Sequence, residues 1–233
     1  MARESAPSEG GARAMTIVSP PPSDLEGRSA EEVLEHAVER FHPSLYVACS
    51  FQKETSVIVH MLLEIEPEAR FFTLDTGFFF PETYATWEAL ERRFGIEIDV
   101  YQGPTAARQA ALHGDELWRR DPEACCALRK VSPLEDALTG VEAWVSGLRR
   151  EQSPGRARAA KLDWDARRAV HKVNPLADWG ERDVWSYILG HDLPYNELHD
   201  RGYGSIGCTH CTKPGVGREG RWEGSERTEC GIH

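Results

Sequence analysis

Short apolar segments alternate with helical segments through the middle of the chain, and this alternation restricts the fold more than any other feature of the sequence. Helices and strands that alternate in this way form crossover units, so we expect an α/β fold with a parallel sheet. The segments predicted as buried strands are residues 45–49, 71–74, 96–100, 143–146 and 170–173. The helices are predicted at residues 29–38, 55–65, 81–94, 105–113 and 181–189.

The two ends of the chain differ from this middle part. Residues 1–23 are rich in Pro, Ser, Gly and Ala, which predicts a disordered leader. Residues 24–207 are expected to form one α/β domain. Residues 196–233 contain many glycines and few apolar runs, which indicates irregular structure that is organised by a metal centre or left mobile. Residues 208–233 are predicted to be a C-terminal segment that contains a CxxC motif and ends in a mobile catalytic tail.

Charge and hydropathy exclude several classes of function. The chain has 38 acidic and 27 basic residues and a net charge of −11, so it lacks the cationic surplus that nucleic acids and anionic membranes require. No stretch approaches the roughly 20 apolar residues of a membrane-spanning helix, and the first residues lack the apolar core of a signal peptide. We therefore predict a cytoplasmic protein, in which the six cysteines stay reduced and serve as ligands or redox groups.

Four of the cysteines occur in two pairs. Cys208 and Cys211 form a CxxC motif, which occurs in zinc sites, iron–sulfur sites and dithiol redox sites. Cys125 and Cys126 are adjacent, so their side chains point in different directions and rarely serve one mononuclear ion. A cluster of several irons is wider and accepts thiolates from different directions. We therefore predict a 4Fe-4S cluster, with a structural zinc site as the alternative.

The other two cysteines have different predicted roles. Cys230 lies three residues before the last residue, where a cysteine is either incidental or a nucleophile on a mobile arm. Cys49 ends an apolar strand, so we expect a buried, inert thiol.

A loop that suits an anion follows the first predicted strand. It comprises Ser50, Phe51, Gln52, Lys53, Glu54 and Thr55, and it leads into a helix whose N-terminus exposes backbone N–H groups. The loop resembles the Ser-Gly-Gly-Lys-Asp-Ser pyrophosphate loop of the ATP pyrophosphatase superfamily, with Phe51 and Gln52 in place of the glycines. These replacements favour a smaller oxyanion, and an ordinary capped helix start is the alternative.

Further candidate binding residues lie at other strand ends and near the C-terminus. Ligands in open parallel sheets bind beyond the carboxyl ends of strands, so the second strand end is predicted to contact a nucleoside, with a tight Asx turn as the alternative. A cation-rich segment, residues 147–156, follows another strand, although such arginines are often solvated. Lys130 is expected one helical turn from the cysteine pair. The candidates are Leu74, Asp75, Thr76, Gly77, Lys130, Gly147, Arg149, Arg156, Arg218 and Arg221.

Together these segments resemble the adenylyl-sulfate (APS) reductase branch of the assimilatory sulfonucleotide reductases, which belong to the phosphoadenylyl-sulfate (PAPS) reductase family. The resemblance covers about residues 44–233 and rests on five ordered motifs: residues 74–77, 125–134, 147–153, 207–212 and 229–233. It implies a Rossmann-like sheet of the adenine nucleotide alpha-hydrolase (PP-loop) type, with residues 24–207 binding the sulfonucleotide. It also implies one 4Fe-4S cluster per subunit on the four paired cysteines, and a homo-oligomer.

The resemblance implies a reaction as well. The Cys230 thiolate would attack the sulfur of APS, AMP would leave, and thioredoxin would release sulfite from the S-sulfocysteine, a step of cysteine biosynthesis. His233 is a candidate for assisting Cys230. The main alternative is a PAPS reductase. More distant alternatives are an ATP-dependent tRNA thiolase, which would need the intact glycine loop and a basic face, and a zinc-stabilised binding module.

Overall fold

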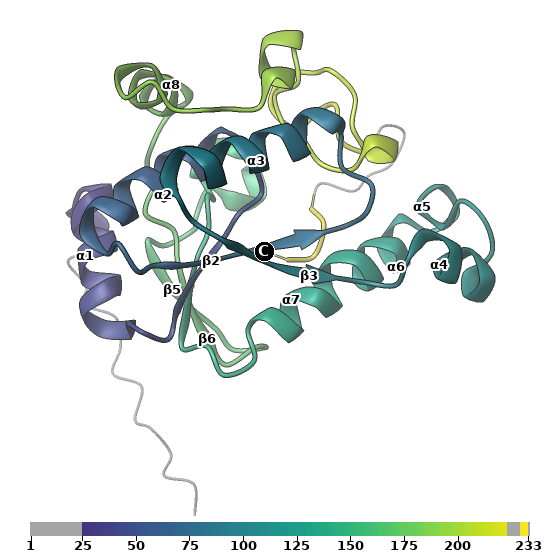
Figure 1. Cartoon of the computed structure of the whole chain (residues 1–233), viewed down its shortest axis with the longest axis horizontal. Coiled ribbons are helices and arrows are strands. Elements are labelled where there is room, and N and C mark those ends of the chain that lie inside the picture. The colour runs from purple at the N-terminus through teal and green to yellow at the C-terminus, as the bar shows by residue number, and fades with distance from the viewer. Residues whose placement is uncertain (1–24, 223–228, 233) are drawn as a thin grey trace, which may run out of the picture.

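The structure is a computed structural model that describes residues 25–222 and 229–232. The predicted leader, residues 1–23, and His233 lie outside the described residues. The described part contains a six-stranded sheet with strand order β3-β2-β1-β4-β6-β5 (Figure 1). The strands are β1 (Leu45–Ala48), β2 (Arg70–Asp75), β3 (Ile98–Gln102), β4 (Ala143–Val145), β5 (Leu162–Asp165) and β6 (Val170–Val173).

The predicted parallel α/β sheet is confirmed, with two differences. Neighbouring strands are parallel except for β5, which pairs antiparallel with β6 and was not predicted. β5 is a short edge strand whose pattern Leu-Asp-Trp-Asp buries only its first residue fully, so it carries little of the apolar signal of a central strand. β3 begins at Ile98 and not at residue 96, because Ile98 is the first residue that pairs with β2.

Helices cover both faces of the sheet (Figure 1). Side chains alternate between the faces along each strand. Val47, Phe71 and Val145 pack in the core shared with α1, α2 and α8, whereas Tyr46 and Phe72 pack against α7 on the other face. The helices are α1 (Ala30–Phe41), α2 (Lys53–Ile65), α3 (Pro81–Phe94), α4 (Ala106–His113), α5 (Leu117–Arg120), α6 (Pro122–Cys126), α7 (Ser132–Ala137) and α8 (Glu181–Gly190).

The strand order places a topological switch point between β1 and β4. From β1 the chain builds the sheet outward to β2 and β3, and then returns to the other side of β1 with β4. The loops after β1 and β4 leave the sheet in opposite directions, and this opens a crevice at the carboxyl ends of the two strands. The fold therefore provides a ligand site at residues 48–50 and 146–147.

The chain after α8 returns to this same edge of the sheet. Asn196 Nδ2 donates to Thr83 Oγ1 at 3.1 Å, and the backbone N–H of Ile206 donates to Gln52 Oε1 at 2.9 Å. The described part of the chain after α8 thus forms one side of the crevice. None of the helices in residues 25–222 is both long enough and apolar enough to cross a bilayer.

Candidate active site

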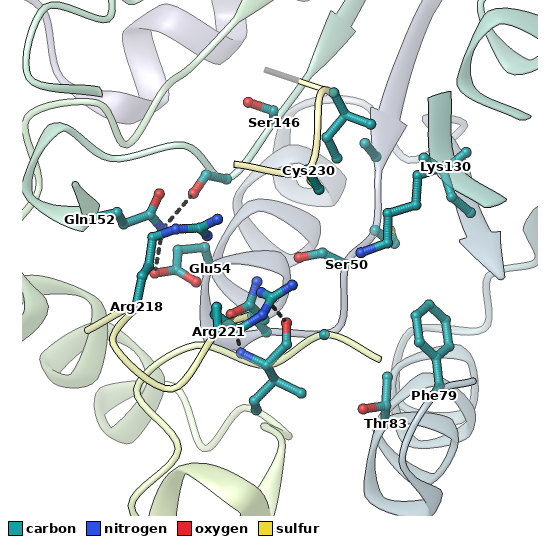
Figure 2. Close-up of a pocket in the computed structure, with 18 of the residues that line it drawn as sticks. Ser50, Glu54, Phe79, Thr83, Lys130, Ser146, Gln152, Arg218, Arg221 and Cys230 are labelled. Atoms are coloured by element: carbon teal, nitrogen blue, oxygen red, sulfur yellow. Dashed lines mark hydrogen bonds between the residues drawn. The ribbon is translucent and has the colours of Figure 1, made fainter. Parts of the chain in front are cut away.

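A pocket lies at the switch point between β1 and β4 (Figure 2). Its walls come from the loops after these strands, from a π-helical turn at Ala127–Val131 and from the chain after α8. The predicted site residues that line it are Ser50, Gln52, Glu54, Leu74, Lys130, Gly147, Arg156, Arg218, Arg221 and Cys230. Side chains that are far apart in the sequence therefore meet in one cavity.

The loop between β1 and α2 holds its shape through local hydrogen bonds. The backbone N–H of Ser50 donates to Thr55 Oγ1 at 3.1 Å. Gln52 is the N-cap residue of α2, but its side chain makes no capping hydrogen bond and instead accepts one from the backbone N–H of Ile206. Ser50 thus faces the pocket, while Gln52 joins the loop to the C-terminal wall.

Phe51 occupies a glycine-like backbone position. Its φ is +55°, the left-handed conformation that glycine adopts most readily. Its side chain is fully buried and stacks on Trp87, with ring centroids 5.1 Å apart. The Phe51 side chain therefore belongs to the core and does not line the pocket.

Lys53 and Arg149 are held by carboxylates beside the pocket. Arg149 donates to Glu54 Oε1 at 2.9 Å and to Glu181 Oε2 at 2.7 Å, and Lys53 Nζ lies 3.2 Å from Glu181. Burial raises the pKa of Glu54, but Lys53 and Arg149 lower it more, so the carboxyl has a pKa below its usual value. Both cations line a neighbouring cavity and not the main pocket, because these carboxylates hold them there.

The end of β2 forms a tight Asx turn, which the sequence predicted as the alternative to a nucleoside contact. Asp75 Oδ1 accepts from the backbone N–H of Gly77 at 2.8 Å and from Tyr84 Oη at 3.0 Å, and Asp75 Oδ2 accepts from Gln102 Nε2 at 2.7 Å. Thr76 Oγ1 lies 3.3 Å from Cys208 Sγ. Of the four residues predicted here, Leu74 lines the pocket. Asp75, Thr76 and Gly77 do not, because their polar groups join the turn to its neighbours.

Three arginines surround the inner end of the pocket. Arg156 and Arg221 are each 7% exposed, so their guanidinium groups are largely removed from water. Arg221 donates to Ser205 Oγ at 3.1 Å and lies over the Trp222 ring, 4.5 Å from its centroid. Burial and the charge of Arg156 lower the pKa of Arg218 to about 10. This concentration of cations makes the pocket suitable for an anion.

Cys230 points into the space between these cations (Figure 2). The residue is 7% exposed and packs beside Cys126 and Trp222. Burial raises the pKa of the Cys230 thiol, but Lys130 and then Arg221 lower it more, so the pKa is below its usual value. The thiolate is the nucleophilic form of cysteine. Cys230 therefore has the environment of a reactive thiol.

Lys130 connects Cys230 to the cysteine pairs. It belongs to the π-helical turn, a local irregularity that often occurs at functional sites. Burial lowers the pKa of Lys130, but the charges of Cys208 and Cys230 raise it above its usual value. The ammonium therefore stays protonated between the thiolates and the pocket.

The two cysteine pairs lie close together. Cys125 and Cys126 end α6, and the segment with Cys208 and Cys211 docks beside it, where the His210 ring stacks on Trp118 with centroids 4.5 Å apart. Burial, then Cys208 and Cys126, raises the pKa of Cys211 to about 11. Gln109 Nε2 lies 3.9 Å from Cys125 Sγ. The thiols of the two pairs are therefore near enough to interact electrostatically.

Cys49 also lies at the pocket wall, as a buried thiol. Burial and the charge of Glu91 raise its pKa well above the usual value, in contrast to Cys230. The structure is therefore consistent with the inert role predicted for it.

Two contributors to the site escaped the sequence analysis. Gln152 lines the pocket and bonds Glu54, with Nε2 3.2 Å from Oε1. Glu229 accepts two hydrogen bonds from Arg156, at 2.7 and 2.6 Å. Within residues 229–233, the sequence patterns point to roles for Cys230 and His233 and to none for Glu229. The position of Glu229 beside that cysteine was the available signal, but an ion pair across 73 residues leaves no local pattern.

Known protein families include one whose sequence profile covers the residues of this site. The sequence profile described as the phosphoadenosine phosphosulfate reductase domain matches residues 44–214, which include the sheet, the pocket loops and both cysteine pairs. The chain belongs to the phosphoadenosine phosphosulfate reductase family. The family resemblance predicted from the motifs is therefore confirmed.

Relatives within the phosphoadenosine phosphosulfate reductase family match nearly the whole chain. The adenosine 5′-phosphosulfate reductase of Geobacillus thermodenitrificans is 46% identical over 218 residues, which cover 91% of this chain and 93% of that protein. The phosphoadenosine 5′-phosphosulfate reductase of Gloeobacter violaceus is 44% identical over 217 residues, or 89% of this chain and 90% of that protein.

Two solved structures share the fold of this chain, one from the same family and one from outside it. A phosphate complex of the PAPS reductase from Candida auris has a TM-score of 0.72 and 31% identity, covering 80% of this chain and 91% of that one. An FMN adenylyltransferase from Candida glabrata has a TM-score of 0.58 and 16% identity, covering 79% of this chain and 63% of that one, and so shares the fold alone. The expected PP-loop type of sheet is confirmed.

The donor set of the cysteine pairs fits an iron–sulfur cluster. The six cysteines are all free thiols, and burial, then the charges of Cys126 and Cys208, raises the pKa of both Cys125 and Cys211. Within residues 25–222 and 229–232, no three His, Cys, Asp or Glu side chains are grouped to hold one metal ion. The Gln109 amide donates to Cys125 Sγ at 3.9 Å, and the charge of Lys130 interacts with Cys208 and Cys126. Such surroundings suit an anionic thiolate-bound group.

Proposed function

We propose that the chain reduces adenylyl sulfate (APS) to sulfite and AMP, with Cys230 as the nucleophile and thioredoxin as the reductant. The observation that carries the proposal is a thiol with a lowered pKa that points into a cationic pocket at the switch point of the sheet. Most of the closely similar relatives are named as reductases of APS, which supports this substrate. The reaction would belong to sulfate assimilation and cysteine biosynthesis.

The pocket has parts that suit both halves of APS. Phe72, Leu74 and Phe79 contribute apolar surface, which suits the adenosine. Lys130 and the three arginines Arg156, Arg218 and Arg221 contribute positive charge, which suits the phosphosulfate.

Ser50 and Gln52 add polar groups at the start of α2. Three further side chains lie outside the pocket and hold its loops in place: Lys53, Arg149 and Asp75.

The first step is attack of the Cys230 thiolate on the sulfur of the sulfuryl group. A sulfur–sulfur bond forms, and the bond between that sulfur and the bridging phosphate oxygen breaks. AMP leaves with the electron pair of the broken bond, and the enzyme carries an S-sulfocysteine. The cations are needed because an anionic nucleophile approaches an anionic group while negative charge grows on the phosphate. Lys130 and Arg221, which lower the pKa of Cys230, are placed to offset both charges.

The second step is thiol exchange. A thioredoxin thiolate attacks the Cys230 sulfur, sulfite leaves, and a mixed disulfide forms. The second thioredoxin thiol then attacks this disulfide, which frees Cys230 and leaves thioredoxin oxidised. The dithiol supplies both electrons. Cys230 is almost fully buried, so the tail must leave the pocket before a protein thiol can reach it.

A 4Fe-4S cluster on Cys125, Cys126, Cys208 and Cys211 completes the proposal. When bound, the cluster would supply a fixed anionic group that orders the two cysteine segments and the Lys130 side chain between it and the pocket. Neither step above passes electrons through it. A homo-oligomer in the cytoplasm is part of the same proposal and follows from the family resemblance.

The decisive assay compares APS with PAPS on anaerobically purified protein, with thioredoxin as the reductant. We expect sulfite release from APS at a kcat/KM far above that for PAPS. A preference for PAPS would assign the chain to the other activity named among its relatives. Incubation with ³⁵S-labelled APS in the absence of reductant should leave the label on Cys230. Label on another residue, or no label, would contradict the covalent step.

A further inference from the structure

The carboxylate of Glu229 occupies part of the arginine site. Arg156 donates to it through Nε at 2.7 Å and through a terminal nitrogen at 2.6 Å, which is a bidentate pair. Arg218 donates to the same carboxylate at 3.2 Å, and so does the hydroxyl of Ser153. A bidentate arginine–carboxylate pair is among the strongest and most directional polar contacts in proteins.

This contact is well shielded from water. The Arg156 side chain is 7% exposed and that of Glu229 is 25% exposed. Burial raises the pKa of Glu229, but its hydrogen bonds and ion pairs with Arg156 lower it more, so the carboxyl stays ionised at neutral pH. Removal of one partner from a shielded ion pair costs more than removal of one partner from an exposed surface salt bridge, because the remaining charge is left without water or a counter-ion.

The contact also determines where Cys230 lies, because Glu229 is its neighbour in the chain. On the other side of Cys230, Arg168 donates to the backbone carbonyl of Gly231 at 3.4 Å, which is a long and weak bond. Ile232 packs against the apolar wall of the pocket. Among the described tail residues, Glu229 thus makes the strongest polar contacts.

We propose that Glu229 is a positioning residue for the reaction: its ion pair with Arg156 latches the C-terminal tail in the pocket, and opening of this pair exposes Cys230. The latch uses guanidinium groups that an anionic substrate would also contact, so the docked tail and the substrate share the same cations. The role of the latch in catalysis rests on the proposed function, whereas its effect on the exposure of Cys230 does not.

The test measures how fast iodoacetamide alkylates Cys230 in the full-length holoenzyme without substrate. A pH of about 8.5 is suitable, because an ordinary cysteine is already half ionised there and the rate reports mainly exposure. Trypsin cleavage after Arg227 releases a peptide in which Cys230 is the single cysteine, so mass spectrometry reads this site alone. The variants are Glu229→Gln, Arg156→Gln and the double variant, with Glu219→Gln as the matched control on an exposed carboxylate.

We expect alkylation about tenfold faster in Glu229→Gln and in Arg156→Gln, since a charge-assisted bond of this kind corresponds to at least a tenfold change in a docking equilibrium. The double variant should be no faster than either single variant, because both remove the same contact. Glu219→Gln should react like the wild type, and Glu229→Asp should recover part of the protection. Equal rates in Glu229→Gln and Glu219→Gln, or additive effects in the double variant, would overturn the latch.

A kinetic measurement separates the latch from the proposed function. In a single turnover with APS and no reductant, Glu229→Gln should form S-sulfocysteine about tenfold more slowly, while APS binds at least as tightly as in the wild type. If no variant and no wild-type protein reacts with APS but the alkylation rates differ as expected, the function fails and the latch stands. If all proteins react alike and alkylate alike, the latch fails and the function stands.

Discussion

A Cβ atom added to Gly147 would lie 2.7 Å from the Cβ atom of Glu54. Gly147 follows β4 and Glu54 is the second residue of α2, so the two loops that form the switch point touch here. The φ angle of Gly147 is not positive, so this glycine is needed for the close approach and not for a special backbone conformation. The two loops can therefore approach this closely only because Gly147 has no Cβ atom.

Replacement of Gly147 with alanine should push the start of α2 away from β4. We expect the free energy of unfolding to fall by about 1–3 kcal/mol, as for other overpacked positions, and KM for APS to rise because the pocket wall moves. Anaerobic urea unfolding and steady-state kinetics measure the two effects. The control is Gly190→Ala, where an added Cβ meets nothing within 4 Å. Equal unfolding midpoints for the two variants would show that the loops adjust without cost.

The predicted roles of Cys230 and Cys126 are separable by spectroscopy. Cys230→Ser should keep the visible absorbance of the cluster but lose sulfite release by about 10³-fold or more, because the nucleophile is gone. Cys126→Ser should lose both the absorbance and the activity, because it removes a cluster ligand. Iron content, the visible spectrum and the assay are measured on the same preparations. A Cys230→Ser variant that releases sulfite at the wild-type rate would refute the nucleophile.

Glu54 stabilises the loops around the pocket through a buried ion pair. Its carboxylate lies 2.9 Å from Arg149, and both side chains are almost fully buried. Glu54→Gln should therefore lower the free energy of unfolding by about 3 kcal/mol, since it leaves a buried guanidinium with one carboxylate fewer. The control is Glu135→Gln, which breaks an exposed pair with Arg167 and should cost less than about 1 kcal/mol. Similar urea midpoints for both variants would contradict the buried pair as a stabilising contact.

The lowered pKa of Lys172 should make the free energy of unfolding depend on pH. Its ammonium lies 5.0 Å from the centre of the Trp144 ring, and burial, then Arg156, lowers its pKa from 10.5 to about 8. Between these two pH values the unfolded chain binds more protons than the folded one, so this residue makes the free energy of unfolding rise with pH. Below about pH 8 the full cost of the buried charge is present, on the order of 3 kcal/mol.

Lys172→Met removes this charge and keeps most of the apolar stem. We expect the variant to be more stable than the wild type by about 1–3 kcal/mol at pH 7, with the difference shrinking as the pH approaches 10. Anaerobic urea unfolding at several pH values measures it, and Lys213→Met tests an exposed lysine in the same way. A difference that is constant with pH would show that the charge of Lys172 is not its cause.

The sequence determined the parts of this protein that depend on local patterns. A buried central strand must be apolar throughout, so five strands and the α/β class could be predicted. The loop after β1 could be placed because a strand–loop–helix junction is local, and the cysteine pairs stood out by spacing alone. β5 escaped because an edge strand with one fully buried residue has no such pattern.

The tertiary structure alone decided which polar side chains face the pocket. Arg149 and Arg156 lie in one loop and looked equivalent, yet Arg149 pairs with Glu54 and Glu181 beside the pocket, whereas Arg156 lines it and holds Glu229. The Asp75 carboxylate accepts hydrogen bonds from three donors in the turn and its neighbours, and two of these donors come from other elements of the fold. The physical reason is the same in each case. A charged side chain takes the partners that the strand order brings within 3 Å of it, and most of those partners lie tens of residues away in the chain.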